Sequence, residues 1–311
     1  MSIKVTVSNF ARAESEHMFR NIVGQAGGTN LWSHGYTPTE IDQQPIIRMN
    51  RDTLYSAAII DISQDATVVL PDAGDRYMSM MVVSAEHYIP VVFHGGGRHE
   101  LKRDEIGTDF VLIAVRTLVD PEDSADVKIV NDLQNAMEIH SVGGQEFVLP
   151  EYDAASYKAT RDAILVLSAG LPNLNNAFGK QGEVEPVRHL LGTAYGWGGL
   201  PDAEARYLNI DPGLPVGEYE LTVRDVPVDG FWSISLYNAE GFFQENPEGL
   251  YSVNSVTGTQ NEDGSYTVRF GGDTSLPNTL PIMDGWNYIV RLYQPRPEIL
   301  DGSWVFPSIN Q

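Results

Sequence analysis

Large apolar and polar residues alternate from Phe231 to Tyr237, and a turn signal follows at residues 238–241. Alternation with a period of two predicts a half-buried strand, with one face in a core and the other in water. The second face carries the hydroxyl groups of Ser233, Ser235 and Tyr237, where a solvated strand usually carries charges. Two interpretations stay open: the hydroxyl-rich outer face of a β-sandwich, or the wall of a binding site.

The same pattern occurs earlier in the chain, where residues 75–86 match residues 229–240 without a gap. Ser79 aligns with Ser233, and both stretches begin with Asp and end with Ala-Glu. Farther on, each half has an Asp seven residues before an Arg, across an apolar segment: Asp109 and Arg116, then Asp284 and Arg291. Two matches in the same order predict a divergent duplication of one β unit, with Arg116 equivalent to Arg291.

Residue periodicity predicts a mainly β chain with helices at the start and in the middle. Helical patterns cover residues 10–24, 124–137, 152–169, 184–195 and 202–207. Strand patterns cover two runs that flank residues 48–53, and then residues 66–71, 76–83, 88–94, 109–116, 217–225, 230–237, 250–257, 265–271 and 286–293. Together they predict two antiparallel β-sandwich-like, jelly-roll-like domains with helices between them and at the N-terminus.

A chain of 311 residues is long enough for two domains with cores of ordinary size. We expect residues 1–45 to form an N-terminal helix and loop, and residues 46–145 to form a first β domain. Residues 146–210 are expected to form a helical connection, and residues 211–311 a second β domain. The boundary depends on which β domain claims the middle helices.

Composition limits the class of protein. The hydrophobic fraction of 42% is that of a globular chain, and no apolar run approaches the roughly 18 residues of a membrane span. The formal net charge of −22 argues against nucleic-acid binding, because phosphates would be repelled. The absence of cysteine excludes disulfides and cysteine nucleophiles. Residues 1–8 lack the apolar core of a signal peptide, which predicts a cytoplasmic protein, or a periplasmic one if the native start was trimmed.

Familiar cofactor and catalytic motifs are missing from the sequence, including the Gly-x-Ser-x-Gly elbow, the phosphate-binding loop and the His-Glu-x-x-His zinc helix. We therefore expect no cofactor. His87, His94 and His99 suggest a metal site, but residues 87 and 94 would point to opposite faces of one strand. Exposed strand and turn histidines are the simpler interpretation, so no metal is assigned.

The richest polar cluster, Arg48, Asn50, Arg51, Asp52 and Tyr55, lies between two apolar runs. Charged residues in such a place must be paired, solvated or directed into a cleft. One hypothesis is a structural Arg51–Asp52 ion pair, and the other is recognition of an anion by the planar Arg fork. Under either hypothesis, the guanidinium of Arg51 is shielded from bulk water.

The second β domain offers matching polar groups for a ligand. We expect the candidates on its strands to be Trp232, Ser233, Tyr237, Arg291 and Tyr293. No pair of carboxylates can be singled out for glycoside chemistry among 42 acidic residues.

Several motifs resemble a known pair of domains. The first domain is suggested by Asn50-Arg51-Asp52-Thr53-Leu54-Tyr55-Ser56, by Pro71-Asp72 with Asp75-Arg76-Tyr77, and by Val115-Arg116-Thr117. The second is suggested by Phe231-Trp232-Ser233, Tyr251-Ser252, Asp263-Gly264, Leu280-Pro281, Arg291-x-Tyr293-x-Pro295 and Asp301-Gly302-x-Trp304. In this combination the chain resembles proteins that join the domain of unknown function 1254 to the domain of unknown function 1214, over residues 40–140 and 190–307.

The resemblance implies two antiparallel β domains with helical additions, often assembled as oligomers, and no defining activity. Two functions stay open. The first is the binding of a small polar or anionic metabolite between the β domains, by a binding protein or by a hydrolase or lyase that needs no cofactor. The second is a non-catalytic, homo-oligomeric structural or surface-interaction protein.

Overall fold

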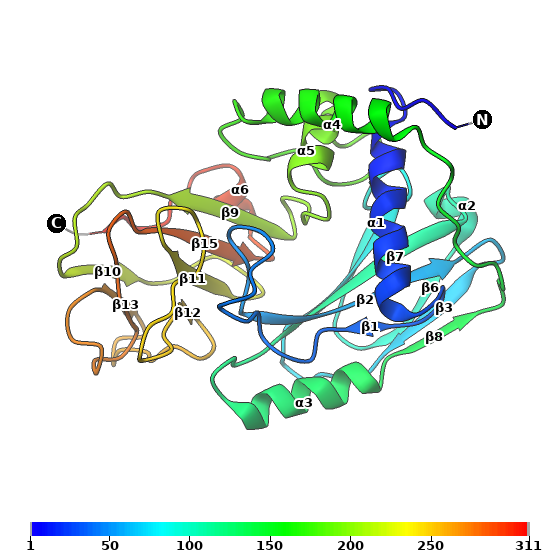
Figure 1. Ribbon diagram of the computed structural model, residues 1–311. Coiled ribbons are helices and arrows are strands. Elements are labelled where there is room, and N and C mark those ends of the chain that lie inside the picture. The colour runs from blue at the N-terminus through cyan, green and yellow to red at the C-terminus, as the bar shows by residue number, and fades with distance from the viewer. Residues whose placement is uncertain (1, 310–311) are drawn as a thin grey trace. The chain divides into compact units, whose positions relative to one another are not determined.

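Figure 1 shows the computed structural model of the chain, which describes residues 2–309. The chain divides into two compact units. Unit 1 comprises Met1–Tyr36, Tyr55–Thr117 and Ile129–Asp202, and unit 2 comprises Thr37–Leu54, Leu118–Lys128 and Ala203–Gln311. Two segments from the first half of the chain therefore belong to the compact unit of the second half. The four sequence segments given above stay a prediction.

Unit 1 contains a five-stranded and a three-stranded sheet. The larger sheet has the strand order β1-β2-β7-β4-β5, and the smaller has the order β6-β3-β8. Their strands are β1 (Ser33–His34), β2 (Thr53–Asp61), β3 (Ala66–Leu70), β4 (Met78–Ser84), β5 (Val91–His94), β6 (Gly97–Leu101), β7 (Phe110–Leu118) and β8 (Glu138–Ser141). Apolar side chains from both sheets form one buried core, which includes Ile60, Val68, Met80 and Ile113.

Three helices of unit 1 pack on one another. The first, α1 (Phe10–Ala26), contacts both α4 (Ala154–Ser168) and α5 (Pro186–Tyr195). Phe10 of α1, Ile164 of α4 and Leu191 of α5 share an apolar core. Two further helices, α2 (Arg103–Ile106) and α3 (Ser124–Asn135), lie between strands in the sequence. Over residues 2–309, no helix has both the length and the apolar character needed to cross a bilayer.

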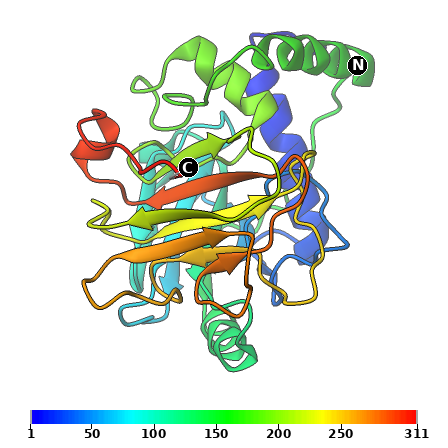
Figure 2. The same cartoon turned by 90° about the vertical axis from the view of Figure 1, so that its left-hand side faces the viewer.

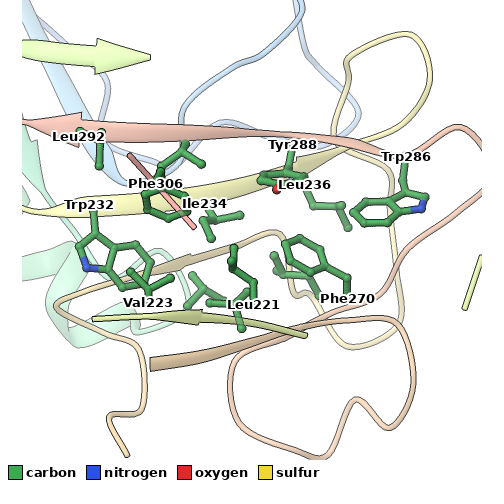
Figure 3. Packing of buried hydrophobic residues seen from close by; sticks show 14 of the residues in the cluster. Leu221, Val223, Trp232, Ile234, Leu236, Phe270, Trp286, Tyr288, Leu292 and Phe306 are labelled. Carbon is green, nitrogen blue, oxygen red and sulfur yellow. The ribbon is translucent and has the colours of Figure 1, made fainter. Parts of the chain in front are cut away.

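Unit 2 contains a four-stranded sheet of order β12-β11-β15-β9 and a three-stranded sheet of order β10-β13-β14 (Figure 2). Its elements are β9 (Ala205–Ile210), β10 (Tyr219–Val223), β11 (Trp232–Tyr237), β12 (Ser252–Asn254), β13 (Tyr266–Phe270), β14 (Thr279–Leu280), β15 (Asn287–Tyr293) and α6 (Pro297–Leu300). Leu221 and Phe270 from one sheet face Trp232, Ile234 and Tyr288 from the other (Figure 3). This two-layer packing gives unit 2 its core.

The two units repeat one strand arrangement. In unit 1, β4 pairs antiparallel with β7 and β5, and β3 pairs antiparallel with β6. In unit 2, β11 pairs antiparallel with β15 and β12, and β10 pairs antiparallel with β13. The register repeats as well, because Ser79 lies opposite Arg116 and Ser233 lies opposite Arg291. The mainly β, antiparallel, duplicated architecture predicted from the sequence is confirmed, whereas the jelly-roll comparison stays a prediction.

Two local predictions are wrong. Residues 202–207 were expected to be helical, but β9 begins at Ala205 and pairs with β15 along its whole length. The strand expected just ahead of residue 48 does not form, and β2 begins only at Thr53. In β9 the tertiary pairing with a buried neighbour outweighs a weak helical pattern.

The hydroxyl face of β11 is also not in water. All six residues of β11 are buried, and Ser233, Ser235 and Tyr237 each have no exposed surface. The face is covered by the part of residues 37–54 that packs on this sheet in unit 2. The alternating pattern of β11 therefore distinguishes an apolar core face from a polar face, and both faces are buried.

Candidate functional site

Polar side chains form a row across the larger sheet of unit 2. Arg291 on β15 lies opposite Ser233 on β11, which in turn lies opposite Asn254 on β12. Directly opposite residues of antiparallel strands share one face of the sheet, so these side chains are neighbours. Ser235 and Ser252 form the next pair on the same face.

Arg291 is the centre of this buried polar layer and is only 3% exposed. Its Nη1 donates to Ser235 Oγ at 2.7 Å, and its Nη2 donates to Tyr237 Oη at 2.8 Å. Nη2 also reaches the carbonyl oxygens of Arg48 at 2.9 Å and Met49 at 3.1 Å. Burial opposes the charge, but the interactions with Tyr237 and other neighbours outweigh it and raise the pKa of Arg291. The guanidinium is therefore held charged by protein groups.

Asp52 supplies the carboxylate of the polar layer and has no exposed surface. Ser233 Oγ donates to Asp52 Oδ2 at 2.6 Å, and the side chains of Ser252 and Asn254 also neighbour the carboxyl group. Burial raises the pKa of Asp52, and the positive charge of Arg291 partly opposes that rise. Asp52 is thus a desolvated carboxyl whose proton is held more tightly than usual.

Tyrosine hydroxyls and an amide tie residues 48–52 to the sheet. Tyr237 Oη donates to the carbonyl of Met49 at 2.6 Å, and burial raises the pKa of Tyr237. Asn50 Nδ2 donates to Tyr293 Oη at 3.0 Å, while Asn50 Oδ1 accepts from the backbone N–H of Asp52 at 2.8 Å. Six of the predicted site residues therefore meet in one buried network: Asn50, Asp52, Ser233, Tyr237, Arg291 and Tyr293.

Arg51 points to a different place and pairs with Glu122 rather than with Asp52. Its Nη2 is 3.0 Å from Glu122 Oε1, and its Nη1 donates to the carbonyl of Thr39. The guanidinium carbon lies 5.0 Å from the centre of the Tyr251 ring, at cation–π distance. Arg51 is 8% exposed, so its head group is shielded from bulk water.

A cavity of about 140 Å³ lies beside this pair, and all its lining residues belong to unit 2. We call it the unit 2 pocket. The polar side chains in its wall are Asp120, Glu122, Tyr251, Ser252, Asn254 and Thr257. Burial raises the pKa of Asp52, and the side chains of Ser252 and Asn254, which also neighbour its carboxyl, act to lower it. Ser252 and Asn254 therefore separate the pocket from the buried Asp52 carboxyl.

Some polar groups of the pocket have structural duties. Asn254 Oδ1 accepts from the backbone N–H groups of Val256 at 2.9 Å and Thr257 at 2.8 Å, which shapes the loop after β12. Asp120 Oδ1 accepts from the backbone N–H of Glu122 at 3.1 Å just ahead of α3. These bonds hold the wall in one conformation.

Family comparisons match the two halves of this architecture. Residues 29–100 match the family described as "Protein of unknown function (DUF1254)", and residues 202–297 match the one described as "Protein of unknown function (DUF1214)". The chain is a paired DUF1254–DUF1214 protein. The polar layer and the unit 2 pocket draw residues from both halves of the sequence, because residues 37–54 and 118–128 belong to unit 2.

Two solved structures share the fold. The VPA0106 protein from Vibrio parahaemolyticus is 18% identical, with a TM-score of 0.76, over 98% of this chain and 97% of that one. An uncharacterized protein from Burkholderia cenocepacia is 14% identical, with a TM-score of 0.53, over 98% of this chain and 86% of that one. No curated protein matched. At these identities the likeness concerns the fold alone.

Trp232 and Tyr55 lie apart from the polar layer, whereas Arg48 takes part in it through its backbone carbonyl. Trp232 points into the apolar core of unit 2 (Figure 3), where it packs edge-on against Tyr266. Tyr55 belongs to unit 1, where the guanidinium of Arg116 lies 5.5 Å from its ring centre. Arg48 contributes its carbonyl to Arg291, and its guanidinium lies 5.9 Å from the Tyr237 ring.

His87 is buried rather than exposed and serves the packing of unit 1. The Thr193 hydroxyl donates to the carbonyl of His189, so it accepts from His87 Nδ1 at 2.8 Å. His87 Nε2 accepts from the backbone N–H of Gly198 at 3.0 Å. Both ring nitrogens are used by a neutral imidazole, and burial lowers the pKa of His87 to about 3.

The other two histidines considered for a metal go elsewhere. His94 lies opposite Ser79 on β5, and His99 lies on β6 with its ring 4.4 Å from that of Phe93. In the described part of the chain, no three potential metal ligands of the His, Cys, Asp or Glu type converge.

Sequence patterns missed Glu122 and the role of β12 in the site. Glu122 lies in the acidic opening of α3, where acidic residues are common for electrostatic reasons, so nothing marked it as a partner of Arg51. The only sequence indication for Ser252 was the Tyr251-Ser252 motif. A second hollow of about 580 Å³ in unit 1, on β3, β6 and β8, was also not expected, because β6 and β8 were not predicted.

Proposed function

We propose that this protein binds a small polar molecule in the unit 2 pocket. The proposal rests on the position of Ser252 and Asn254, which line the pocket and also neighbour the buried Asp52. A polar wall backed by a fixed hydrogen-bonded layer is pre-organised, which lowers the entropic cost of binding.

The size of the pocket limits what enters it. A volume of about 140 Å³ corresponds to roughly five water molecules at about 30 Å³ each. Pockets for drug-sized ligands usually span about 300–1,000 Å³. We therefore expect either a molecule of a few heavy atoms or the terminal group of a larger one.

Recognition of an anion by arginine has less support than recognition of a hydrogen-bond donor. The head groups of Arg51 and Arg291 already bind Glu122, hydroxyls and backbone carbonyls. The side chains left to face the pocket are carboxylates, hydroxyls and an amide. We therefore propose a polar ligand rather than an anionic one.

Catalysis is a second candidate, favoured by the raised pKa of Asp52. A carboxyl that stays protonated nearer to neutral pH is suited to general acid chemistry, as a hydrolase or lyase without a cofactor requires. Asp52 has no exposed surface, however, and Ser252 and Asn254 lie between it and the cavity. Binding therefore ranks ahead of catalysis.

A non-catalytic homo-oligomer is favoured by the outer face of α4. Val166 and Leu167 are 76% and 67% exposed there, and the neighbouring exposed residues Ala159 and Ala163 are small. Light scattering after size exclusion tests this candidate, with Val166→Lys as the disrupting variant. A monomeric wild type would remove it.

The experiment for the binding proposal is native mass spectrometry of the purified protein, followed by a thermal-shift screen of small polar metabolites. Ser252→Val is the test variant, because Val92 occupies the equivalent position on β5 of unit 1. Val92→Ser is the matched control. We expect any retained or stabilising ligand to be weakened by Ser252→Val and unaffected by Val92→Ser. Equal effects of the two variants, or a folded protein that neither retains nor responds to any ligand, would contradict the proposal.

A further inference from the structure

We propose that His87 and His189 form an acid-sensitive latch in unit 1, which holds the turn after β4 against residues 177–198 and releases it when the pH falls. The turn comprises residues 84–89, and residues 177–198 include α5. This conformational change lies within unit 1 and is independent of the unit 2 pocket.

Imidazole nitrogens join the turn to residues 177–198. From the turn, His87 Nε2 accepts from the backbone N–H of Gly198 at 3.0 Å. From α5, His189 Nε2 lies 3.1 Å from the carbonyl oxygen of Glu86. Both histidines are buried, with 0% and 6% of their surfaces exposed. The protonation of two buried rings therefore bears directly on this contact.

His87 fits the contact only as a neutral imidazole. The Thr193 hydroxyl donates to the carbonyl of His189, so the hydrogen of His87 lies on Nδ1 and the lone pair on Nε2. A proton on Nε2 would set its N–H against the N–H of Gly198 and break that hydrogen bond. The closed contact therefore excludes protonation of His87.

His189 can carry a proton within the contact. Its Nε2 faces the carbonyl of Glu86, and its Nδ1 faces the carbonyl of Ala177 at 3.3 Å. A neutral imidazole donates to one of these oxygens, whereas an imidazolium donates to both. Burial lowers the pKa of His189, and the bonds to the two carbonyls oppose that effect. His189 is thus the member of the pair that takes up the first proton.

A second proton would not be compensated by the groups around the rings. The two imidazoles are stacked with their centres 5.6 Å apart, and the column of rings continues to Tyr88 on one side and Trp197 on the other. The carboxylate of Glu86 favours a charge on His189, but it is already bound to Arg12 of α1. Two imidazolium rings at this distance would repel each other.

Other charged side chains on the elements packed around the pair already have partners within unit 1. They are Glu14, Glu16 and Arg12 on α1, and Glu185 and Arg188 at the start of α5. These charges are directed at other groups, so the closed contact holds at most one proton on its two imidazoles.

Acid therefore favours release of the turn. In water both imidazoles are charged at pH 5, since their pKa is about 6.5 there. The open form thus binds one more proton than the closed form, and its population rises as the pH falls through about 6.5. Burial lowers the pKa of His87 to about 3, in agreement with its exclusion from protonation. Opening also withdraws the carbonyl of Gly198 from Arg116, which donates to it at 3.2 Å.

Amide hydrogen exchange of the whole protein, followed by nuclear magnetic resonance at pH 7 and pH 5, tests the latch. The reporters are the N–H groups of Gly198, bound to His87, and of Ile89, which donates to the carbonyl of Gly179 at 2.8 Å. The hydrogen-bonded N–H of Ile62, a fully buried residue of unit 1, reports on unfolding of the unit.

We expect the protection factors of Gly198 and Ile89 to fall at least about 25-fold from pH 7 to pH 5, because one imidazole must stay neutral in the closed form. They should lie below the protection factor of Ile62 at both pH values, since the opening is local.

His87→Asn and His140→Asn form the variant pair. Asn tolerates the left-handed backbone of residue 87 and does not titrate, so the pH dependence of Ile89 protection should shrink to a few-fold. His140 is an exposed histidine of β8, and its variant should keep the full pH dependence of the wild type. The melting temperature of each variant shows whether it is folded.

The ring nitrogen shifts of the wild-type protein distinguish the two imidazoles. As the pH falls, both nitrogens of His189 should become protonated before Nε2 of His87 does. Protonation in the reverse order would contradict the assignment of the first proton to His189.

Three further results would overturn the latch. Protection of Gly198 and Ile89 that is the same at pH 7 and pH 5 would show that protons do not control the contact. Protection equal to that of Ile62 at both pH values would show that the contact opens only when unit 1 unfolds. A His140→Asn variant that loses the pH dependence as His87→Asn does would place its origin elsewhere. The wild-type measurements decide the matter even where a variant fails to fold.

Discussion

Arg116 of unit 1 and Arg291 of unit 2 occupy the same position in strand pairs of identical register, but they have different surroundings. Arg291 binds two side-chain oxygens and two backbone carbonyls in a layer that also holds Asp52. Arg116 donates to the carbonyl of Gly198 and lies over the ring of Tyr55. The two units therefore share their strand geometry, whereas the segments that cover the strands determine which groups bind the arginine.

The strands beside these pairs differ in the same way. β12 presents Ser252 and Asn254, whereas the equivalent positions of β5 carry Val92 and His94. Only the β12 residues line the unit 2 pocket. A polar edge next to a buried charged layer is thus a property of one repeat and not of the shared fold.

The largest effect should come from replacing the two arginines by methionine. Arg291→Met leaves the buried Asp52 carboxyl without its compensating charge and should cost about 3–5 kcal/mol of unfolding free energy. Arg116→Met should cost about 1–2 kcal/mol, since it removes a hydrogen bond to a carbonyl and a ring contact. Urea denaturation measures both, and equal losses would break the comparison.

The serines opposite these arginines give a smaller contrast. Ser233→Ala removes a 2.6 Å hydrogen bond to Asp52 and should cost about 1.5–3 kcal/mol. Ser79 accepts from the Tyr77 hydroxyl at 3.1 Å, so Ser79→Ala should cost about 0.5–1.5 kcal/mol. Denaturation curves should show a larger loss of unfolding free energy for Ser233→Ala than for Ser79→Ala. The reverse order would contradict a charged polar layer that is confined to unit 2.

The turns that follow β4 and β11 predict a different dependence of stability on pH in the two units. His87 and Gly241 occupy equivalent turn positions with positive φ, at 64° and 91°. The pKa of His87 is about 3 in the folded protein and near 6.5 when unfolded, so the unfolded chain takes up the proton first and stability falls as pH drops below about 6.5. Between pH 6.5 and pH 5 this residue should account for a loss of about 2 kcal/mol.

His87→Asn tests that pH effect, because Asn tolerates the left-handed backbone. The variant should be less stable than the wild type at pH 7 and should lose less stability between pH 6.5 and pH 5. Chemical denaturation at several pH values measures the difference. Parallel pH profiles of the two proteins would show that His87 is not held neutral.

Arg51 should matter less for stability than Arg291 does. Its carboxylate partner Glu122 has a side chain that is 54% exposed, so the charge left behind by Arg51→Ala remains solvated. We expect a loss of about 1–2 kcal/mol, below that for Arg291→Met. Thermal melts check this, and a loss as large as that of Arg291→Met would mean that Arg51 belongs to the buried layer.

Much of the fold could be predicted from local patterns. The alternation in residues 231–237 and its match in residues 75–86 correctly predicted β11 and β4, and the Asp-to-Arg spacing placed Arg291 and Arg116 on equivalent strands. Such patterns report which side chains share a face. They do not report whether another segment covers that face, so the burial of the β11 hydroxyls was missed.

The candidate site was only partly predictable for the same reason. Asn50 and Asp52 stood out as polar residues between apolar runs, but their partners Tyr293 and Ser233 lie about 240 and 180 residues away. No local pattern encodes such a contact. His87, expected in an exposed position, is buried because Thr193 and Gly198 of a distant segment supply its hydrogen bonds.

The most direct test compares Ser252→Val with Val92→Ser, which change equivalent positions of β12 and β5. Ser252→Val should weaken the binding of any retained or stabilising ligand, and Val92→Ser should leave that binding unchanged. Equal effects of the two variants would contradict the claim that the polar site belongs to one repeat.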